Sequence, residues 1–433
     1  MELLTVSLTM IALLVLFLGG SVWIFISLSL VSFGSFYFFT DLPFGSILAN
    51  IFWNNTSGSA MMALPLFIFM GEILFRSKIS ENLFNGLCPW MDSIPGRLIH
   101  VNIFACTLFA AVSGSSAATT ATVGKITIPE LTRRGYDKSL AIGSLAGSGT
   151  LGFLIPPSMM MLVYGIIAEV SIGKLFIAGF IPGLILAFMF SGYVIVKSLS
   201  NPNLAPAGKT HYGWSERIKA IPLLAPVVTL VFIVLGSIYM GWATPTEAAA
   251  VGVTGALVFA FLTRSLNWTV FKTALMGSVK TSCMIMAIVC GAAYLSVAVG
   301  YLGITRSLTQ YVASLGLSPY TLILILSIMY IGLGCLVDGF SMIVMSTPIT
   351  LPLIKAAGFE PLWFGIYLVL MIQLAQITPP VGFNLFVINN LTNDELWIIA
   401  KAALPFFIML CIGTALITIF PQITLYLPGL MIG

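Results

Sequence analysis

The residues best suited to binding chemistry lie around two proline pairs, Pro156–Pro157 and Pro379–Pro380, which interrupt two apolar stretches in different halves of the chain. Proline lacks a backbone donor and its ring clashes with the preceding turn, so each pair is expected to split a helix into two halves. A broken helix leaves amide donors free at one half and carbonyl acceptors free at the other. Amides suit an anionic carboxylate, and carbonyls suit a small cation such as sodium. The two pairs therefore predict matching sites for a solute and an ion.

Small polar residues gather near both breaks. The first has Ser113, Ser115, Ser116, Ser148, Gly149 and Thr150 nearby, and the second has Asp338, Ser341, Gln373, Gln376, Thr378 and Asn384. A single Ser or Thr in a membrane helix more often bonds its own backbone or lets helices pack closely, but the clustering favours a binding role. Asp338 is the only acidic residue predicted near mid-membrane, where an ionisable group is functional by default; a helix cap is the alternative.

The composition is that of a membrane protein. Of 433 residues, 59% are hydrophobic and 7% are charged, which predicts an all-α polytopic fold. The net charge of +4 is small and its basic residues are explained by membrane orientation, so no nucleic acid partner is expected. The six cysteines lack metal-site spacing and are interpreted as core thiols. The first apolar stretch, Leu3 to Phe17, follows no basic region and is interpreted as a retained span.

Ten apolar windows have a length typical of membrane spans. They cover residues 3–18, 21–39, 57–75, 139–168, 175–199, 219–240, 246–262, 282–300, 361–389 and 395–420. Two further regions, about 99–132 and 320–356, each contain two apolar arms shorter than the roughly 20 residues needed to cross. Their polar tips predict re-entrant helical hairpins that turn back at mid-membrane.

The chain contains an internal repeat, whose constant offset is the separation in sequence between Pro156 and Pro379. The coincidences at this offset are Pro129 with Pro352, Gly135 with Gly358, Pro156 with Pro379, Pro157 with Pro380 and Pro182 with Pro405. We therefore divide the chain into a first repeat (1–199), a cytoplasmic linker (200–218) and a second repeat (219–433). Each repeat has a hairpin and a broken helix, the latter at about 138–168 or 361–389. The offset also pairs two short segments, 44–54 and 267–277, which are predicted to be interfacial arms.

Five crossings in each repeat would invert the second repeat relative to the first, because an odd number reverses direction. A cytoplasmic linker places most Lys and Arg residues on the cytoplasmic side, as the positive-inside rule expects. Both termini are then extracytoplasmic.

Other classes of protein fit less well. An intramembrane serine protease needs a histidine beside its serine, and an aspartyl protease needs two facing carboxylates. The sequence offers one aspartate predicted to be buried and no such histidine, so an enzyme is not expected. A channel can also use re-entrant hairpins, but two broken helices in an inverted pair favour alternating access. Glu247 is interpreted as structural, in a capping box with Thr244 and with Pro245 at the first helical position.

The longest motifs have a recognisable pattern. The first half contains SGSSAATTATVGKITIPELTRRGYD, GTLGFLIPPS and GKLFIAGFIPG, and the second contains TPTEAAAVG, LVDGFSMIVMSTPITLPL and WFGIYLVLMIQLAQITPPVGFNLFVI. In order and spacing, over nearly the whole chain, they resemble the large membrane subunit of tripartite ATP-independent periplasmic (TRAP) transporters, the DctM type.

This resemblance implies a sodium-driven importer with an elevator mechanism, in which the hairpins and broken helices move against a scaffold of the other spans. It implies one sodium site at Ser113, Ser115, Gly149 and Pro156, and a symmetric one at Asp338, Gly339, Thr378 and Pro380. The solute carboxylate is expected between the hairpin tips, with Ser116, Thr150, Ser341, Asn384 and, more weakly, Lys125 as candidate ligands.

Sodium is the coupling ion in this interpretation, and no cofactor is expected. The implied partners are a periplasmic substrate-binding protein, a separate small four-helix membrane subunit, a carboxylate of the C4-dicarboxylate or sialic acid type, and the lipids of the bacterial inner membrane. The alternative is a stand-alone sodium- or proton-coupled carboxylate transporter that needs no binding protein.

Overall fold

The computed structural model describes residues 2–40, 43–206, 212–335, 337–380 and 382–431, and these residues form helices without strands. The first half contains α1 (Glu2–Gly19), α2 (Ile24–Phe39), α3 (Phe44–Ser57), α4 (Ser59–Arg76), α5 (Ile79–Met91), α6 (Ile99–Ser113), α7 (Ser116–Arg133), α8 (Lys138–Gly149), α9 (Met159–Ala168) and α10 (Ile172–Ser200). The second half contains α11 (Trp214–Tyr239), α12 (Pro245–Leu262), α13 (Trp268–Tyr301), α14 (Ile304–Ser314), α15 (Pro319–Gly334), α16 (Gly339–Ala356), α17 (Pro361–Gln376), α18 (Phe383–Thr392), α19 (Leu396–Ile419) and α20 (Gln422–Gly429). Residues 207–211 of the predicted linker (200–218) lie outside the described residues. Helix α11 begins at Trp214, before the predicted end of the linker.

Many of these helices can cross a membrane. By length and composition, six described helices qualify, or seven if α3 and α4 are counted as one bent span. The six are α10, α11, α12, α13, α16 and α19. Helix α16, predicted as a hairpin arm, is among them, whereas its partner arm α15 belongs to the shorter apolar helices. The chain is therefore an all-helical polytopic membrane protein, while the number of crossings stays a prediction.

The helix boundaries repeat at the offset found in the sequence. At that offset, both ends of α7 coincide with those of α16, and the start of α8 coincides with the start of α17. A break follows both α8 and α17, and both proline pairs contain a cis peptide bond. Each predicted hairpin consists of two helices that pack against each other, α6 with α7 and α15 with α16. The inverted orientation of the second repeat stays a prediction.

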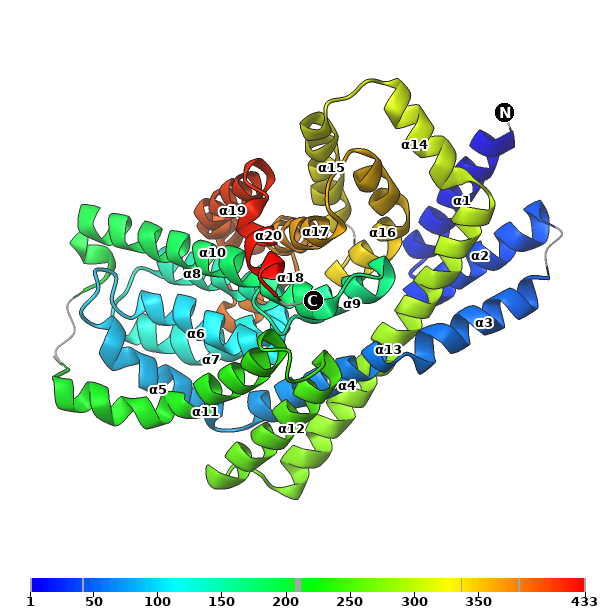
Figure 1. The fold of residues 1–433 in the computed structure, drawn as a ribbon. Coiled ribbons are helices and arrows are strands. Elements are labelled where there is room, and N and C mark those ends of the chain that lie inside the picture. Colours follow the sequence, from blue (N-terminus) through cyan, green and yellow to red (C-terminus); the bar gives the residue numbers. More distant parts are fainter. Residues whose placement is uncertain (1, 41–42, 207–211, 336, 381, 432–433) are drawn as a thin grey trace.

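The prediction of a separate second arm is wrong. In the first repeat, α3 ends at an extended Gly58 before α4 begins, so the arm and the span are distinct helices. The corresponding position in the second repeat is Thr281, and there the chain continues as one 34-residue helix, α13. Threonine offers the backbone less freedom than glycine, so nothing at this position favours an interruption. Helix α13 runs diagonally across the molecule (Figure 1).

Contacts sort most of the helices into two groups. In one group, α4 packs on α12 and α13, and α13 also packs on α2. The other group holds the hairpins and broken helices, and it is tied together across the repeats: α7 contacts α18, and α9 contacts α16 in the matching position. The groups meet where α4 contacts α6 and where α13 contacts α16.

A glycine allows a close approach between α4 and the tip of the first hairpin. A β-carbon at Gly71 of α4 would lie 3.1 Å from both the Cα and the carbonyl oxygen of Ser113, at the end of α6. Gly71 therefore lets the tip of the first hairpin rest directly on α4. Elsewhere in this group, the predicted cap of α12 is confirmed: Thr244 and Glu247 form a capping box, with Pro245 at the start of the helix.

Candidate functional site

The tip of the first hairpin is held by hydrogen bonds among its own residues. Helix α6 ends at Ser113 and is followed by Gly114, which has the left-handed backbone (φ 59°) that glycine adopts without strain. Ser115 caps α7 by accepting from the Ala118 amide at 3.4 Å. The Thr119 hydroxyl donates to the Ser115 carbonyl at 2.7 Å and lies 2.8 Å from Ser113 Oγ. Several oxygen atoms thus converge within one turn.

The first broken helix places its irregular backbone inside the protein. Helix α8 ends at Gly149, a 3₁₀ turn (Thr150–Phe153) follows, and α9 starts after Ser158. The Ser158 side chain caps α9 and also donates to the Phe153 carbonyl. Every residue of the break from Gly149 to Ser158 is buried. This agrees with the rule that unwound backbone at membrane depth lies within protein.

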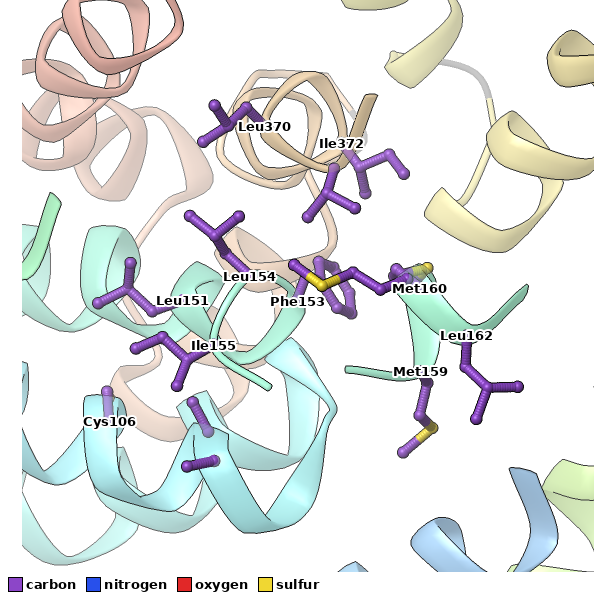
Figure 2. Packing of buried hydrophobic residues seen from close by; sticks show 14 of the residues in the cluster. Cys106, Leu151, Phe153, Leu154, Ile155, Met159, Met160, Leu162, Leu370 and Ile372 are labelled. Atoms are coloured by element: carbon purple, nitrogen blue, oxygen red, sulfur yellow. The ribbon is translucent and has the colours of Figure 1, made fainter. Parts of the chain in front are cut away.

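Apolar side chains anchor this break from both sides. Figure 2 shows Leu151, Leu154 and Ile155 between the helix that carries Cys106 and the helix that carries Leu370. These helices are α6 and α17, so the first break is packed between a hairpin of its own repeat and the broken helix of the other repeat. The packing fixes where the polar groups of the break point.

Three close approaches join the break to the hairpin tip. A β-carbon at Gly149 would overlap with Thr120 Oγ1 on α7. A β-carbon at Gly152 would lie 2.9 Å from the Ser115 carbonyl oxygen and 3.0 Å from the Ser116 amide nitrogen. A β-carbon at Gly114 would lie 2.9 Å from the carbonyl oxygen of Pro157. We call this meeting of the first tip and the first break the first junction.

Two polar contacts link the first junction to the second repeat. Ser116 Oγ donates to Asn384 Oδ1 at 2.9 Å, which joins α7 to α18. Thr150 Oγ1 donates to the Gly147 carbonyl at 2.7 Å and lies 3.4 Å from Gln373 Oε1 on α17. Thr150 and Gln373 are themselves separated by the repeat offset, so two equivalent positions of the repeat touch each other. This contact marks where the two breaks come together.

Three polar atoms at the first junction have no hydrogen-bond partner among the residues that the structure describes. They are Thr120 Oγ1, the side-chain nitrogen of Gln373 and the side-chain nitrogen of Asn384, and all three residues are fully buried. An unpaired buried polar group costs about 1–3 kcal/mol. The three atoms comprise one hydroxyl, which can ligate a cation or donate to an anion, and two amide nitrogens, which only donate. Such a set can hold a cation beside an anion.

The second hairpin tip has a different chemistry. Asp338 caps α16 by accepting from the amides of Phe340 at 3.0 Å and Ser341 at 3.4 Å, and it also accepts from the Ser341 hydroxyl. The alternative role as a cap is therefore confirmed. The expectation of a buried carboxylate is wrong, because Asp338 is exposed. Asp338 corresponds to Ser115, so the two tips share a cap but differ in charge.

The second break is also less enclosed than the first. Thr378 Oγ1 donates to the Leu374 carbonyl at 2.6 Å, and the Cys335 thiol lies 3.4 Å from the carbonyl oxygen of Pro379. Thr378 is half-buried, and Pro379 and Pro380 are exposed. Gly339 is buried against the end of α17, where a β-carbon would lie 3.7 Å from the side-chain nitrogen of Gln376.

The structure brings together most of the predicted residues. Those at the first junction are Ser113, Ser115, Ser116, Gly149, Thr150 and Asn384, with Pro156 inside the break. Asp338, Gly339 and Ser341 lie at the second tip, and Thr378 and Pro380 lie at the second break. Lys125 is not brought to the junction: it lies nine residues beyond Ser116, or about 14 Å along α7, and its side chain is exposed.

Thr119 and Thr120 were missed as site residues, and Gln373 was noticed only as a neighbour of the second break. Thr119 and Thr120 stand four residues after Ser115 and Ser116, on the same faces of α7. The position of Gln373 at the repeat offset from Thr150 was a usable signal.

A polytopic helical fold, with two proline-broken helices meeting at a buried polar junction, defines this protein as a membrane transporter. The chain belongs to the family described as the tripartite ATP-independent periplasmic transporter, DctM component, whose model matches residues 9–423. It is a transporter subunit and not an enzyme.

Similar proteins include two large permeases. A C4-dicarboxylate TRAP transporter large permease, DctM, from Pseudomonas aeruginosa is 35% identical over 85% of this chain and 86% of its own length. A sialic acid TRAP transporter large permease, SiaM, from Vibrio cholerae is 31% identical over 86% of this chain and 87% of its own. The crystal structure of the Alcanivorax borkumensis YdaH transporter shares the fold, with a TM-score of 0.61 over 90% of each chain at 13% identity.

Proposed function

We propose that this chain is the large membrane subunit of a sodium-coupled importer for a carboxylate-bearing solute. The observation that carries the proposal is the set of three buried, unpaired polar atoms at the first junction. Both named relatives are permeases for carboxylate-bearing solutes, a C4-dicarboxylate and sialic acid. Buried polar groups without partners are costly, so a ligand that completes their bonding is the economical reason for them.

The solute carboxylate is assigned to the two amide donors. The side-chain nitrogens of Gln373 and Asn384 are free because their oxygens already face Thr150 and Ser116. A carboxylate accepts hydrogen bonds from both amides without a buried counter-charge. Ser341, at the second tip, remains a candidate for the other end of the solute.

Sodium is assigned to the oxygen atoms at each tip. The first site comprises Ser113, Ser115, Gly149 and Pro156, to which the free hydroxyl of Thr120 is added. The second comprises Asp338, Gly339, Thr378 and Pro380, with the carboxylate of Asp338 as its only charge. Hydroxyl and carbonyl oxygens are hard ligands, which suit a hard cation.

The proposal extends to the partners and the movement, and membership of the family supports it. A periplasmic binding protein delivers the solute, a small membrane subunit braces the scaffold, and both act at the bacterial inner membrane with the chain termini on the outer side. The group of hairpins and broken helices moves as a body past α4 and α13. Its contact with α4 at Gly71 is then a sliding surface.

Reconstitution tests the proposal. We expect this chain, with its small subunit in liposomes, to take up labelled C4-dicarboxylate or sialic acid only with an inward sodium gradient and the matching binding protein. A potassium gradient of the same size is the control for ionic strength and membrane potential. Uptake without the binding protein favours the stand-alone transporter, and uptake that ignores sodium contradicts sodium coupling.

A further inference from the structure

A cavity lies between the second break and α19, away from the first junction. It has a volume of about 390 Å³ and is lined by Thr378 and Pro379 on one side and by α19 on the other. The α19 residues include Trp397, Lys401, Leu404 and Phe407. This volume falls in the range of sites that bind small molecules. Its lining side chains are apolar apart from the threonine hydroxyl, the Trp397 indole N–H and the Lys401 ammonium group.

The ammonium group of Lys401 is free to bind a ligand. Among the described residues, Lys401 makes no ion pair. Asp394, just before α19, is engaged by Lys138 at 2.6 Å. The cavity therefore carries one uncompensated positive charge, which favours an anionic occupant.

The polarity of the cavity is graded along α19. Trp397 stands in the first turn, Lys401 in the second, and Leu404 and Phe407 follow, over about 15 Å of helix. Trp397 is 72% exposed, as is typical of a tryptophan at the membrane interface. A lysine near the end of a spanning helix reaches the headgroup region with its ammonium group. A phosphate at Lys401 and an acyl chain along Leu404 and Phe407 match this gradient, whereas a small polar solute does not use the apolar walls.

We propose that this cavity is a specific site for an anionic phospholipid, whose phosphate binds Lys401 and whose acyl chain lies against the second break. The lipid then packs on Thr378 and Pro379, which line the cavity. The lipid covers the exposed second break, as side chains of the protein itself cover the first break. The site does not depend on the proposed sodium coupling.

The fluorescence of Trp397 measures the occupancy. The signal of Trp397 is the difference between the wild-type protein and Trp397→Phe, both in liposomes. Lipids brominated on the acyl chain quench a tryptophan that they touch. We expect brominated phosphatidylglycerol to quench Trp397 with about fivefold preference over brominated phosphatidylcholine, the effect of one lysine at an anionic membrane surface. In Lys401→Gln the preference should fall to about one.

Lys272→Gln is the matched control. Lys272 lies four residues after the exposed Trp268 near the start of α13, just as Lys401 follows Trp397, but it does not line the cavity. Its replacement removes the same charge and should leave the Trp397 preference unchanged. In the wild-type protein, added salt should also narrow the preference, a measurement that does not depend on how Lys401→Gln folds.

Two results would overturn the proposal. Equal quenching of Trp397 by both lipids in the wild-type protein would mean that bulk lipid fills the cavity. Relief of the quenching by millimolar succinate would mean that the cavity takes a soluble carboxylate instead.

Discussion

Replacing Thr120 by valine separates a binding role of the first junction from a structural one. Thr120 is fully buried and its hydroxyl has no partner in the described part of the chain, while Gly149 packs directly against it. Valine keeps the branched shape and replaces the hydroxyl by a methyl group. Without sodium, the substitution removes an unpaired buried group, so we expect the free energy of unfolding to rise by about 1–2 kcal/mol. For a chain of this length that is about 1 °C in melting temperature per kcal/mol.

The stabilisation by sodium should decrease in Thr120→Val, although the sodium-free protein becomes more stable. If Thr120 is a ligand, wild-type protein at ten times the dissociation constant gains about 1.4 kcal/mol from sodium. Thr120→Val should lose most of this gain, and its half-saturating sodium concentration for uptake should rise at least about tenfold. The assay is thermal unfolding in detergent across a sodium titration, with potassium chloride holding the ionic strength constant.

A threonine on the same helix provides the control. Thr127 is also fully buried with an unpaired hydroxyl, but it lines a small apolar cavity beside Leu83, away from the first junction. Thr127→Val should stabilise the sodium-free protein similarly and keep the wild-type sodium response. If Thr120→Val responds to sodium like Thr127→Val, Thr120 does not belong to the sodium site.

Substitutions at four further positions test other parts of the structure. Gln373→Met removes an unpaired donor at similar volume, so solute KM in uptake should rise about tenfold or more while the melting temperature holds; an unchanged KM contradicts the carboxylate assignment. Asp338→Asn keeps a capping oxygen without the charge and should lose sodium-driven uptake. Asp338→Ala also removes the cap and should lose about 1 kcal/mol of stability as well. If both variants keep the sodium dependence of uptake, Asp338 does not belong to the second sodium site. Gly71→Ala places a β-carbon 3.1 Å from the first hairpin tip and should slow uptake in liposomes with little change in solute binding by calorimetry; wild-type uptake would refute a sliding contact there. The lysine that bonds Asp394 holds the pKa of that carboxyl below its usual range, so the pair adds stability above the unfolded pKa that is lost as pH falls through the lower folded pKa. Asp394→Asn should therefore cost less than about 1 kcal/mol at pH 7 and nothing in acid, as read from melting temperatures at both pH values.

The breaks, the hairpins and the repeat could be predicted from the sequence because their signals are local. Proline and glycine act on the backbone where they stand, and the repeat offset transfers one break onto the other. The pairing of Ser116 with Asn384 could not be predicted, since these residues are 268 positions apart and meet only through the packing of α7 on α18. The exposure of Asp338 was missed for a related reason. The depth in the membrane that a sequence predicts for a residue does not say whether its side chain faces the protein.

Around the hairpin tips and breaks, the two repeats share helix boundaries but not a chemistry, and this difference bears on how the sites work. Where the first repeat has Ser116, Thr120 and Gly149, the second has Gly339, Ile343 and Ile372. Neutral oxygens around a buried break bind a cation only as a full set, so each of them should matter.

The second tip instead supplies one exposed carboxylate, which attracts a cation through charge and is screened by salt. Sodium binding at the first junction should therefore depend on geometry and respond steeply to single substitutions. Sodium binding at the second tip should depend on ionic strength. A rising concentration of potassium or choline should weaken sodium binding at the second tip before it weakens sodium binding at the first junction.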